Sequence, residues 1–437
     1  MPQAIVVGSG LAGLAAAFRL QEQGWSVTVL EASDRVGGRV LSESRDGFLL
    51  DVGPTLVTDK YTEYFKLIHD AGLSHLVVDS SPLIGVVRGR ELHVIDASRP
   101  LSSFLKTKLL SPRAKLSLLI RARRLAKPLW KLNPYELSDR VHYDHESMGS
   151  YLNRVFGREL NESLFEAVAR GMTLSTAEDA SVLELFAGVV AASGRMQNLR
   201  GGMDALPRAL AERFDVRLTS TVTAVRRTDG GVEVDYRDGS GALAQETADA
   251  CVITAPFTDA AQLYPPLKEA GADLLRVTEY TGCYSLQLMY DHRPGREPFI
   301  IMVPKSASAE VCAVFLEHVK APDRAPAGHS QFTVFFNLNS EIDFAGWSDT
   351  RLTEAARSFL ESIFPELAGH FCGSHLTRWT YAAHKGNVGY YRALVSFLER
   401  YPADDPVQVA GDYMSVAGQE SAVVAGVKAA RRLLSHR

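Results

Sequence analysis

The sequence has few cysteines, no long apolar run and no excess of positive charge. Its four cysteines, at positions 251, 283, 312 and 372, lie far apart and form no C-x-x-C pair, which excludes a cysteine-based zinc site and a disulfide framework. The longest apolar windows, such as 185–192, are much shorter than the roughly 20 residues that cross a bilayer. No basic region precedes the apolar residues 4–7, so we expect no signal peptide and a cytoplasmic protein.

The overall composition is typical of a globular protein. The 437 residues are 46% hydrophobic and 22% charged, and the chain is long enough for several domains. A net charge of -4 gives no global basic field, so we expect no nucleic-acid partner. His142 and His145 flank Asp144 without a further ligand nearby, so we interpret them as a surface turn and predict no metal site.

The first 31 residues carry a dinucleotide-binding pattern. The apolar residues 4–7 predict a buried parallel strand, and a G-x-G-x-x-G loop at 8–13 follows it. Residues 14–23 have helical periodicity, and a second strand at 25–30 ends in Glu31. Such glycines let the backbone turn and approach a pyrophosphate, the helix N-terminus offers free N–H groups to it, and the acid accepts hydrogen bonds from ribose hydroxyls.

The residues after this strand make the prediction more specific. They read E-x-x-x-R-x-G-G-R from Glu31 to Arg39. Here the sequence resembles the flavoprotein superfamily of monoamine oxidases, protoporphyrinogen oxidases and phytoene desaturases, whose FAD site carries this extension. The resemblance continues in D-x-G-P at 51–54, in G-G-M-x-x-L-P at 201–207, and in Gly411-Asp412 before a predicted terminal helix at 418–434.

The glycine pattern and the resemblance together imply a set of FAD-binding residues. Arg39 would supply a cation to the diphosphate, Asp412 would accept a hydrogen bond from the ribitol chain, and the start of the last helix would point at the flavin pyrimidine. The full set is Gly8, Gly10, Leu11, Ala12, Gly13, Glu31, Ala32, Arg35, Gly37, Gly38, Arg39, Gly53, Pro54, Val222, Gly411, Asp412, Gly418 and Gln419.

We therefore predict an α/β fold, in which a Rossmann-like FAD-binding domain of the glutathione-reductase type interlocks with an α+β substrate domain. The FAD-binding domain is expected to be discontinuous, over 1–70, 200–260 and 375–437. The substrate domain is expected over 71–199, where the pattern is mainly helical, and over 261–374, where alternating runs predict a mixed sheet.

A basic and apolar segment lies within the first insertion. Between positions 97 and 135 there are ten Lys or Arg residues and no Asp or Glu, interleaved with leucines and Trp130. This pattern fits a solvated basic face, and it also fits a peripheral contact with the inner face of a membrane. The sequence leaves both interpretations open, and it does not indicate an oligomeric state.

The reactive group implied by the resemblance is the flavin itself, so no catalytic side chain is assigned. The candidate pocket residues are Ser285, His384, Tyr390 and Tyr391. Amine oxidases place a lysine near flavin N5, and Ser285 falls in the corresponding stretch 284–290. No cysteine occurs near 386–391, where some relatives tether FAD, so we predict non-covalent FAD.

The predicted function is hydride transfer from a hydrophobic small molecule to flavin N5, giving C–C or C–N desaturation, with oxygen or another acceptor reoxidising the flavin. The pattern most resembles protoporphyrinogen oxidase-like flavoproteins, and the predicted desaturation is of the kind that protoporphyrinogen oxidases and phytoene desaturases carry out. Two alternatives stay open: an amine oxidase acting on a primary or secondary amine, and a non-catalytic prenyl- or lipid-binding escort protein of the same fold. The intact phosphate and ribose positions favour an enzyme.

Overall fold

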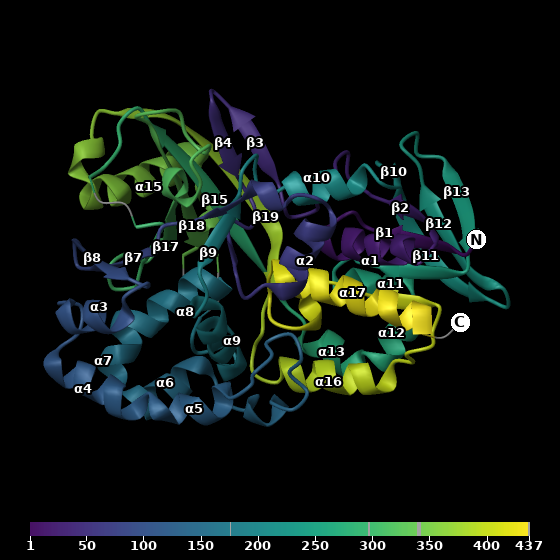
Figure 1. The fold of residues 1–437 in the computed structure, drawn as a ribbon, viewed down its shortest axis with the longest axis horizontal. Helices are drawn as coiled ribbons and strands as arrows, with labels where there is room; N and C mark the ends of the chain where they lie inside the picture. The colour runs from purple at the N-terminus through teal and green to yellow at the C-terminus, as the bar shows by residue number, and fades with distance from the viewer. Residues whose placement is uncertain (175, 296–297, 339–341, 436–437) are drawn as a thin grey trace.

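Two large β-sheets organise the chain, and they lie on opposite sides of the molecule in Figure 1. The computed structural model describes residues 1–174, 176–295, 298–338 and 342–435. Both chain termini lie on the side of the first sheet, while a lobe of helices lies below the second (Figure 1).

The first sheet is parallel, with strand order β10-β2-β1-β14-β20. One face packs against α1 and α17, and the other packs against a three-stranded antiparallel sheet, β11-β12-β13. Because both faces are covered, the strands can consist almost entirely of apolar residues. The elements are β1 (Gln3–Val7), α1 (Leu11–Glu22), β2 (Ser26–Leu30), β10 (Asp215–Arg217), β11 (Thr221–Thr228), β12 (Gly231–Arg237), β13 (Leu243–Ala248), β14 (Ala250–Ile253), β20 (Val407–Val409) and α17 (Gln419–Ser435).

The first and last helices of this sheet cross at a point where only glycine fits. A Cβ atom at Gly426 of α17 would lie 2.1 Å from the backbone oxygen of Ala12 in α1. A Cβ atom at Gly13 would lie equally close, 2.1 Å, to the backbone oxygen of Gly8. Close helix packing therefore fixes the end of the chain against the glycine turn at its beginning.

The second sheet has seven strands in the order β19-β15-β18-β17-β16-β7-β8. Its central strands are buried on both faces of the sheet, and α15 (Asp349–Ile363) packs against one of these faces. The strands are β7 (Leu83–Arg88), β8 (Glu91–Asp96), β15 (Tyr280–Tyr290), β16 (Ile300–Met302), β17 (Val311–Leu316), β18 (Ser330–Asn337) and β19 (Phe371–His384). Strands β7 and β8 come from the first insertion and the rest from later in the chain, so the two insertions share one sheet.

The long strand β19 links the two sheets. Its pairing with β15 runs from Phe371 to His384, so the expected domain boundary between 374 and 375 falls inside a continuous strand. A better division would follow His384, where β19 ends and a short loop leads to α16 (Tyr390–Arg400). The strand thus carries residues from the seven-stranded sheet towards the glycine turn.

The remaining part of the first insertion is mainly helical, as predicted. Serine side chains cap several of its helices: Ser147 accepts the N–H of Ser150 at 3.2 Å, and Ser181 accepts the N–H of Leu183 at 3.4 Å. The helices are α3 (Pro100–Lys106), α4 (Pro112–Arg121), α5 (Arg123–Leu129), α6 (Met148–Phe156), α8 (Glu166–Thr173) and α9 (Val182–Ala192).

Candidate active site

The glycine turn between β1 and α1 leaves room for an anion. Gly8 has φ of 101°, and an isolated bridge pairs Gly10 with Gly37 of the second glycine pair. A Cβ atom at Gly10 would have no heavy atom within 4 Å. Helix α1, which starts with Leu11 and Ala12, has neither a side-chain cap nor an acidic residue in its first turn. Its positive N-terminal end is therefore available to a phosphate.

Glu31 lies at the end of β2 and is held by two serines. One carboxylate oxygen accepts the N–H and the hydroxyl of Ser9, at 2.7 and 2.6 Å, and the other accepts those of Ser33, at 2.9 and 2.8 Å. These bonds fix the carboxylate next to the glycine turn, as expected for a ribose acceptor. The chain at 217–222 runs alongside, since the Ser220 N–H donates to the Glu31 carbonyl at 2.7 Å. Val222 follows on β11 and is buried.

Arg39 and Asp412 come from opposite ends of the chain and form a two-pronged ion pair. The Nη1 and Nη2 atoms of Arg39 donate to Asp412 at 2.9 and 2.6 Å, and Nη1 also donates to the Ala382 carbonyl of β19 at 3.1 Å. Burial alone would raise the pKa of Asp412, but the facing guanidinium outweighs it and holds the pKa below its usual value. The two residues predicted to contact the diphosphate and the ribitol are thus brought together, next to Gly411.

The D-x-G-P loop is packed against Arg39 and Leu41, directly after the second glycine pair. It follows a hairpin of β3 (Ser42–Arg45) and β4 (Phe48–Asp51), which turns at Asp46 and Gly47. A Cβ atom at Gly53 would lie 1.9 Å from the Arg39 carbonyl, so glycine is required there. The indole Nε1 of Trp379 donates to the Val52 carbonyl at 2.8 Å and ties the loop to β19.

The start of α17 faces the same region. Gly418 has φ of 155°, and the Gln419 amide donates to the Leu56 carbonyl at 3.2 Å, just after Pro54. The Oε1 atom of Gln419 is buried and has no hydrogen-bond partner in the described part of the chain. Glu420 accepts the N–H groups of Glu63 and Tyr64 at 2.9 and 2.7 Å, so it caps α2 (Thr62–Asp70).

These residues fit FAD. An open glycine turn, an uncapped helix N-terminus, a fixed carboxylate, an arginine and an unpartnered buried amide oxygen converge from 8–13, 31–39, 51–54 and 411–419. Arg35, Gly38 and Ala32 lie in the turn after β2 within the same group. The donors suit a diphosphate and the acceptors suit sugar hydroxyls.

His384 and Tyr390 lie behind the ion pair. Burial lowers the pKa of His384 to about 4, although the charge of Asp412 opposes that shift, so the ring is neutral at neutral pH. Its two nitrogens have no hydrogen-bond partner of standard geometry among the described residues. The Tyr390 ring stacks on it with centroids 5.0 Å apart, and the Tyr390 hydroxyl donates to the Tyr413 carbonyl at 2.7 Å.

The other two candidate pocket residues are buried and already engaged. Ser285 lies within β15, and its hydroxyl accepts the Gln287 side-chain amide at 2.9 Å. The Tyr391 hydroxyl donates to Glu184 of α9, whose pKa is raised to about 7 by burial despite this hydrogen bond. Tyr390 and Tyr391 therefore form inner packing rather than an open aromatic wall.

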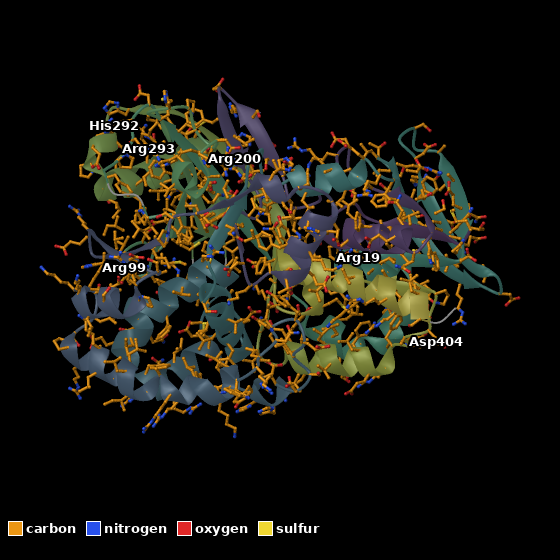
Figure 2. All side chains as sticks on the ribbon, in the orientation of Figure 1. Arg19, Arg99, Arg200, His292, Arg293 and Asp404 are labelled. Carbon is orange, nitrogen blue, oxygen red and sulfur yellow. The ribbon has the colours of Figure 1, made fainter. Side chains whose placement is uncertain are left out.

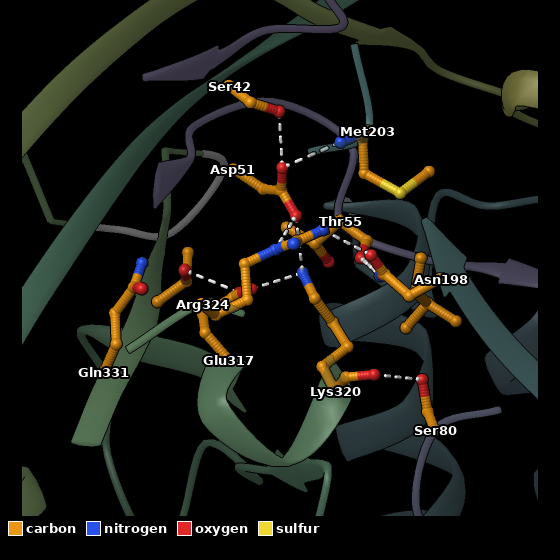
Figure 3. Close-up of polar contacts among 12 residues, drawn as sticks. Ser42, Asp51, Thr55, Ser80, Asn198, Met203, Glu317, Lys320, Arg324 and Gln331 are labelled. Atoms are coloured by element: carbon orange, nitrogen blue, oxygen red, sulfur yellow. Dashed lines mark hydrogen bonds and ion pairs between the residues drawn. The ribbon is translucent and has the colours of Figure 1, made fainter. Parts of the chain in front are cut away.

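A buried cluster of four charges adjoins the D-x-G-P loop, and Figure 3 shows it. Asp51 accepts hydrogen bonds from the Ser42 hydroxyl at 2.6 Å and the Met203 N–H at 3.0 Å, and it pairs with Arg324 at 2.9 Å and Lys320 at 3.3 Å. Lys320 also pairs with Glu317 in α14 (Glu317–Lys320). All four charged side chains have 0% exposure.

Sequence reasoning missed this cluster and placed Asp144 wrongly. We expected a surface turn at 142–145, but Asp144 is fully buried. Its carboxylate accepts the Ser181 hydroxyl at 2.6 Å and the N–H groups of Gly389 and Arg392 at 3.1 and 3.0 Å. It therefore anchors the start of α9 and the start of α16. Only the polar cap pattern at Ser181 could have indicated a partner.

The described ranges hold neither a metal site nor a membrane-spanning helix. No group of three or more His, Cys, Asp or Glu side chains there is arranged to hold a metal ion. No helix there combines the length and the apolar character that a bilayer span needs.

Comparison with known proteins gives consistent results. Residues 11–434 match the model of the family described as flavin containing amine oxidoreductase. Coproporphyrinogen III oxidase of Bacillus subtilis is 21% identical, covering 95% of this chain and 93% of its own. Protoporphyrinogen oxidase 2 of Arabidopsis thaliana is 22% identical, covering 82% and 79%. The structure of cyclohexylamine oxidase from Brevibacterium oxydans superimposes with a TM-score of 0.79 at 19% identity, covering 100% of both chains.

Proposed function

Because the chain belongs to the flavin-containing amine oxidoreductases and FAD is its cofactor, we propose that it oxidises a hydrophobic substrate such as a tetrapyrrole or a terpenoid. The bound flavin supplies a hydride acceptor at N5, which oxygen or another acceptor then restores. The substrate loses a hydride from one carbon and a proton from a neighbouring carbon or nitrogen, and gains a C–C or C–N double bond.

The observation that carries this proposal is the charge state of the groups around the ion pair. Asp412 is neutralised by Arg39, and burial keeps His384 uncharged at neutral pH. Bringing a charged group into such an environment without a counterion is costly. A permanently cationic substrate would meet no unpaired carboxylate among these described residues. An apolar substrate would pay only a small desolvation cost on entering.

The chain's own groups have three tasks in this reaction. The N-terminus of α1 and Arg39 would hold the diphosphate, and Glu31 would hold the ribose. The N-terminus of α17 would stabilise negative charge on the reduced ring. The stacked rings of His384 and Tyr390 would keep water from that side.

The alternative is oxidation of an amine. It is supported by the family description and by the fold shared with cyclohexylamine oxidase. An amine that enters in its neutral form would meet the same uncharged surroundings, so the two proposals differ in the substrate and not in the cofactor site. A non-catalytic lipid-binding role would not require the intact arrangement at Glu31 and Arg39.

An anaerobic visible spectrum of the purified protein tests the proposal. We expect a bound-flavin band, and we expect porphyrinogens, polyenes or squalene-type terpenoids to bleach it. Bleaching by amines alone would replace the proposal with the amine alternative. A flavin band that none of these compounds bleaches would contradict both proposed substrate classes, and a protein without flavin would support the lipid-binding role.

A further inference from the structure

A group of large apolar side chains on the helical lobe is exposed. Five of them lie in helices α3 to α5 or directly after them, and each exposes between 51% and 70% of its surface. They are Leu105, Leu116, Leu119, Ile120 and Trp130. Exposed apolar residues scattered singly are ordinary, but a contiguous group marks an interaction surface.

The geometry of α4 explains how three of these residues form one surface. The helix buries Ala114, and Leu118 packs against the core as a partly buried residue. Leu116, Leu119 and Ile120 lie on the outer side, at the spacing that puts residues on one helical face. The helix therefore has two apolar faces, and among the described residues only the inner face has a partner.

Basic residues surround this outer face. The segment 97–135 contains ten Lys or Arg residues and no Asp or Glu. None of the ten forms an ion pair with a carboxylate of a described residue; Lys115 and Arg121 instead donate to the carbonyls of Leu105 and Val155, at 2.8 and 3.1 Å. Arg113, Arg123 and Arg124 are exposed at the two ends of the apolar face of α4.

The surface lies at the outer edge of the molecule. In Figure 1, α4 and α5 form the lower rim of the helical lobe, on the side away from the parallel sheet. Figure 2 shows nitrogen-tipped side chains projecting outward from this rim. A flat partner could therefore contact both helices together.

We propose that the outer face of α4 and α5 docks on a bilayer that contains anionic phospholipids. The leucines, the isoleucine and Trp130 would enter the boundary between headgroups and acyl chains, and the arginines and lysines would contact the lipid phosphates. Charge complementarity selects this partner, because a segment with ten cations and no acid of its own favours an anionic one, even though Glu159 lies next to Ser111 at the start of α4. The exposed apolar face selects a lipid over a nucleic acid, whose phosphates would leave it in water.

The test is sedimentation of the FAD-loaded protein with vesicles of phosphatidylcholine alone or with 30% phosphatidylglycerol. We expect binding to the anionic vesicles only. The triple substitution Arg113→Gln, Arg123→Gln, Arg124→Gln should weaken it about a hundredfold, at about fivefold per charge removed. The substitution Leu116→Ser, Leu119→Ser, Ile120→Ser should weaken it at least tenfold, because the apolar contact is lost.

Matched controls come from outside the helical lobe of the first insertion. The triple substitution Arg237→Gln, Lys268→Gln, Arg276→Gln removes the same charge from exposed positions, and Leu243→Ser removes an exposed leucine. Neither should change vesicle binding. An unchanged flavin spectrum and circular dichroism would show that each variant is folded.

Three results would overturn the proposal. The first is no binding of the parent protein to anionic vesicles. The second is an equal loss of vesicle binding in the test and control triple variants, which would indicate that the vesicles attract the positive charges of the whole molecule. The third is full binding by the serine variant, which would indicate a purely electrostatic contact with polyanions. Because none of these readouts measures turnover, they are independent of the proposed oxidation.

Discussion

The substitution Asp51→Asn would unbalance the buried cluster of Figure 3. Asp51 and Glu317 balance Lys320 and Arg324, and none of the four side chains has exposed surface. Asparagine has nearly the same shape and can still accept hydrogen bonds from Ser42 and Met203. The change therefore removes one buried negative charge and leaves Lys320 and Arg324 facing Glu317 in the interior, while Arg324 keeps its pair with the partly exposed Asp323 at 2.7 Å.

The expected cost is large for a single substitution. Removing one partner of a buried ion pair destabilises a protein by about 3 to 5 kcal/mol where the remaining charge has no compensation. Because Arg324 still pairs with Asp323 and Lys320 with Glu317, we expect the lower end of that range, about 3 kcal/mol. A domain is stable by only about 5 to 15 kcal/mol, so the substitution would consume a large fraction of that stability. The exposed pair of Asp215 with Arg217, at 3.0 Å, provides the control: Asp215→Asn should cost less than about 1 kcal/mol.

Urea unfolding of the FAD-loaded protein would measure both variants. The double variant Asp51→Asn, Lys320→Met is decisive, because it removes one charge of each sign and leaves Glu317 opposite Arg324. We expect it to recover about 2 kcal/mol relative to Asp51→Asn. The reasoning would be refuted by an Asp51→Asn variant as stable as Asp215→Asn, or by a double variant less stable than the single one.

The same cluster predicts a dependence on acid. Burial would raise the pKa of Asp51, but Arg324 and Lys320 outweigh it and keep the pKa below its usual value. An acid whose pKa is lowered on folding contributes stability above its unfolded pKa of about 4 and loses it as the pH falls through the folded value. Asp51→Asn should therefore be less sensitive to acid than the parent protein below about pH 4.

Two further predictions concern single carboxylates. Glu31→Ala should weaken FAD binding by about 1 to 3 kcal/mol, because the ribose hydroxyls, Ser9 and Ser33 all lose a hydrogen-bond acceptor. Titration of the apoprotein with FAD measures the affinity, with Ser33→Ala as control. Undiminished affinity of Glu31→Ala would exclude the assigned role. Burial raises the pKa of Glu184 to about 7. As the pH rises from about 4.5 to 7, the parent protein should therefore lose about 2 to 3 kcal/mol of stability relative to Glu184→Gln. The prediction would be disproved if the urea midpoints of the two proteins changed equally over that range.

The local elements could be predicted from the sequence because their signals are local. The first strand, the glycine turn, α1 and β2 occupy the first 31 residues, and their periodicity and glycine spacing need no distant partner. Ser181 before an apolar stretch is a local signal for the start of α9, and Asp46-Gly47 is a local signal for the turn of the β3–β4 hairpin. In each case the residues that form the structure are neighbours in the chain.

The buried charges could not be predicted because their partners are far apart in sequence. Lys320 and Arg324 have the spacing of an ordinary exposed helical face, and nothing near them indicates complete burial. Asp51 lies 269 positions from Lys320. The same limit applies to β7 and β8, because their place in the seven-stranded sheet depends on pairing with β16, more than two hundred residues later.

The cofactor site depends on these distant contacts as much as on its local motif. Asp51 is the last residue of β4 and directly precedes the loop whose Val52 carbonyl accepts the Trp379 indole and whose Gly53 packs on Arg39. Arg324 connects the same carboxylate to Asn198 and Leu199, next to the 201–203 loop. The cluster thus joins the seven-stranded sheet to the segments around the glycine turn. Weakening it should loosen FAD before the fold is lost, because the loop loses its anchor while the parallel sheet keeps its own core.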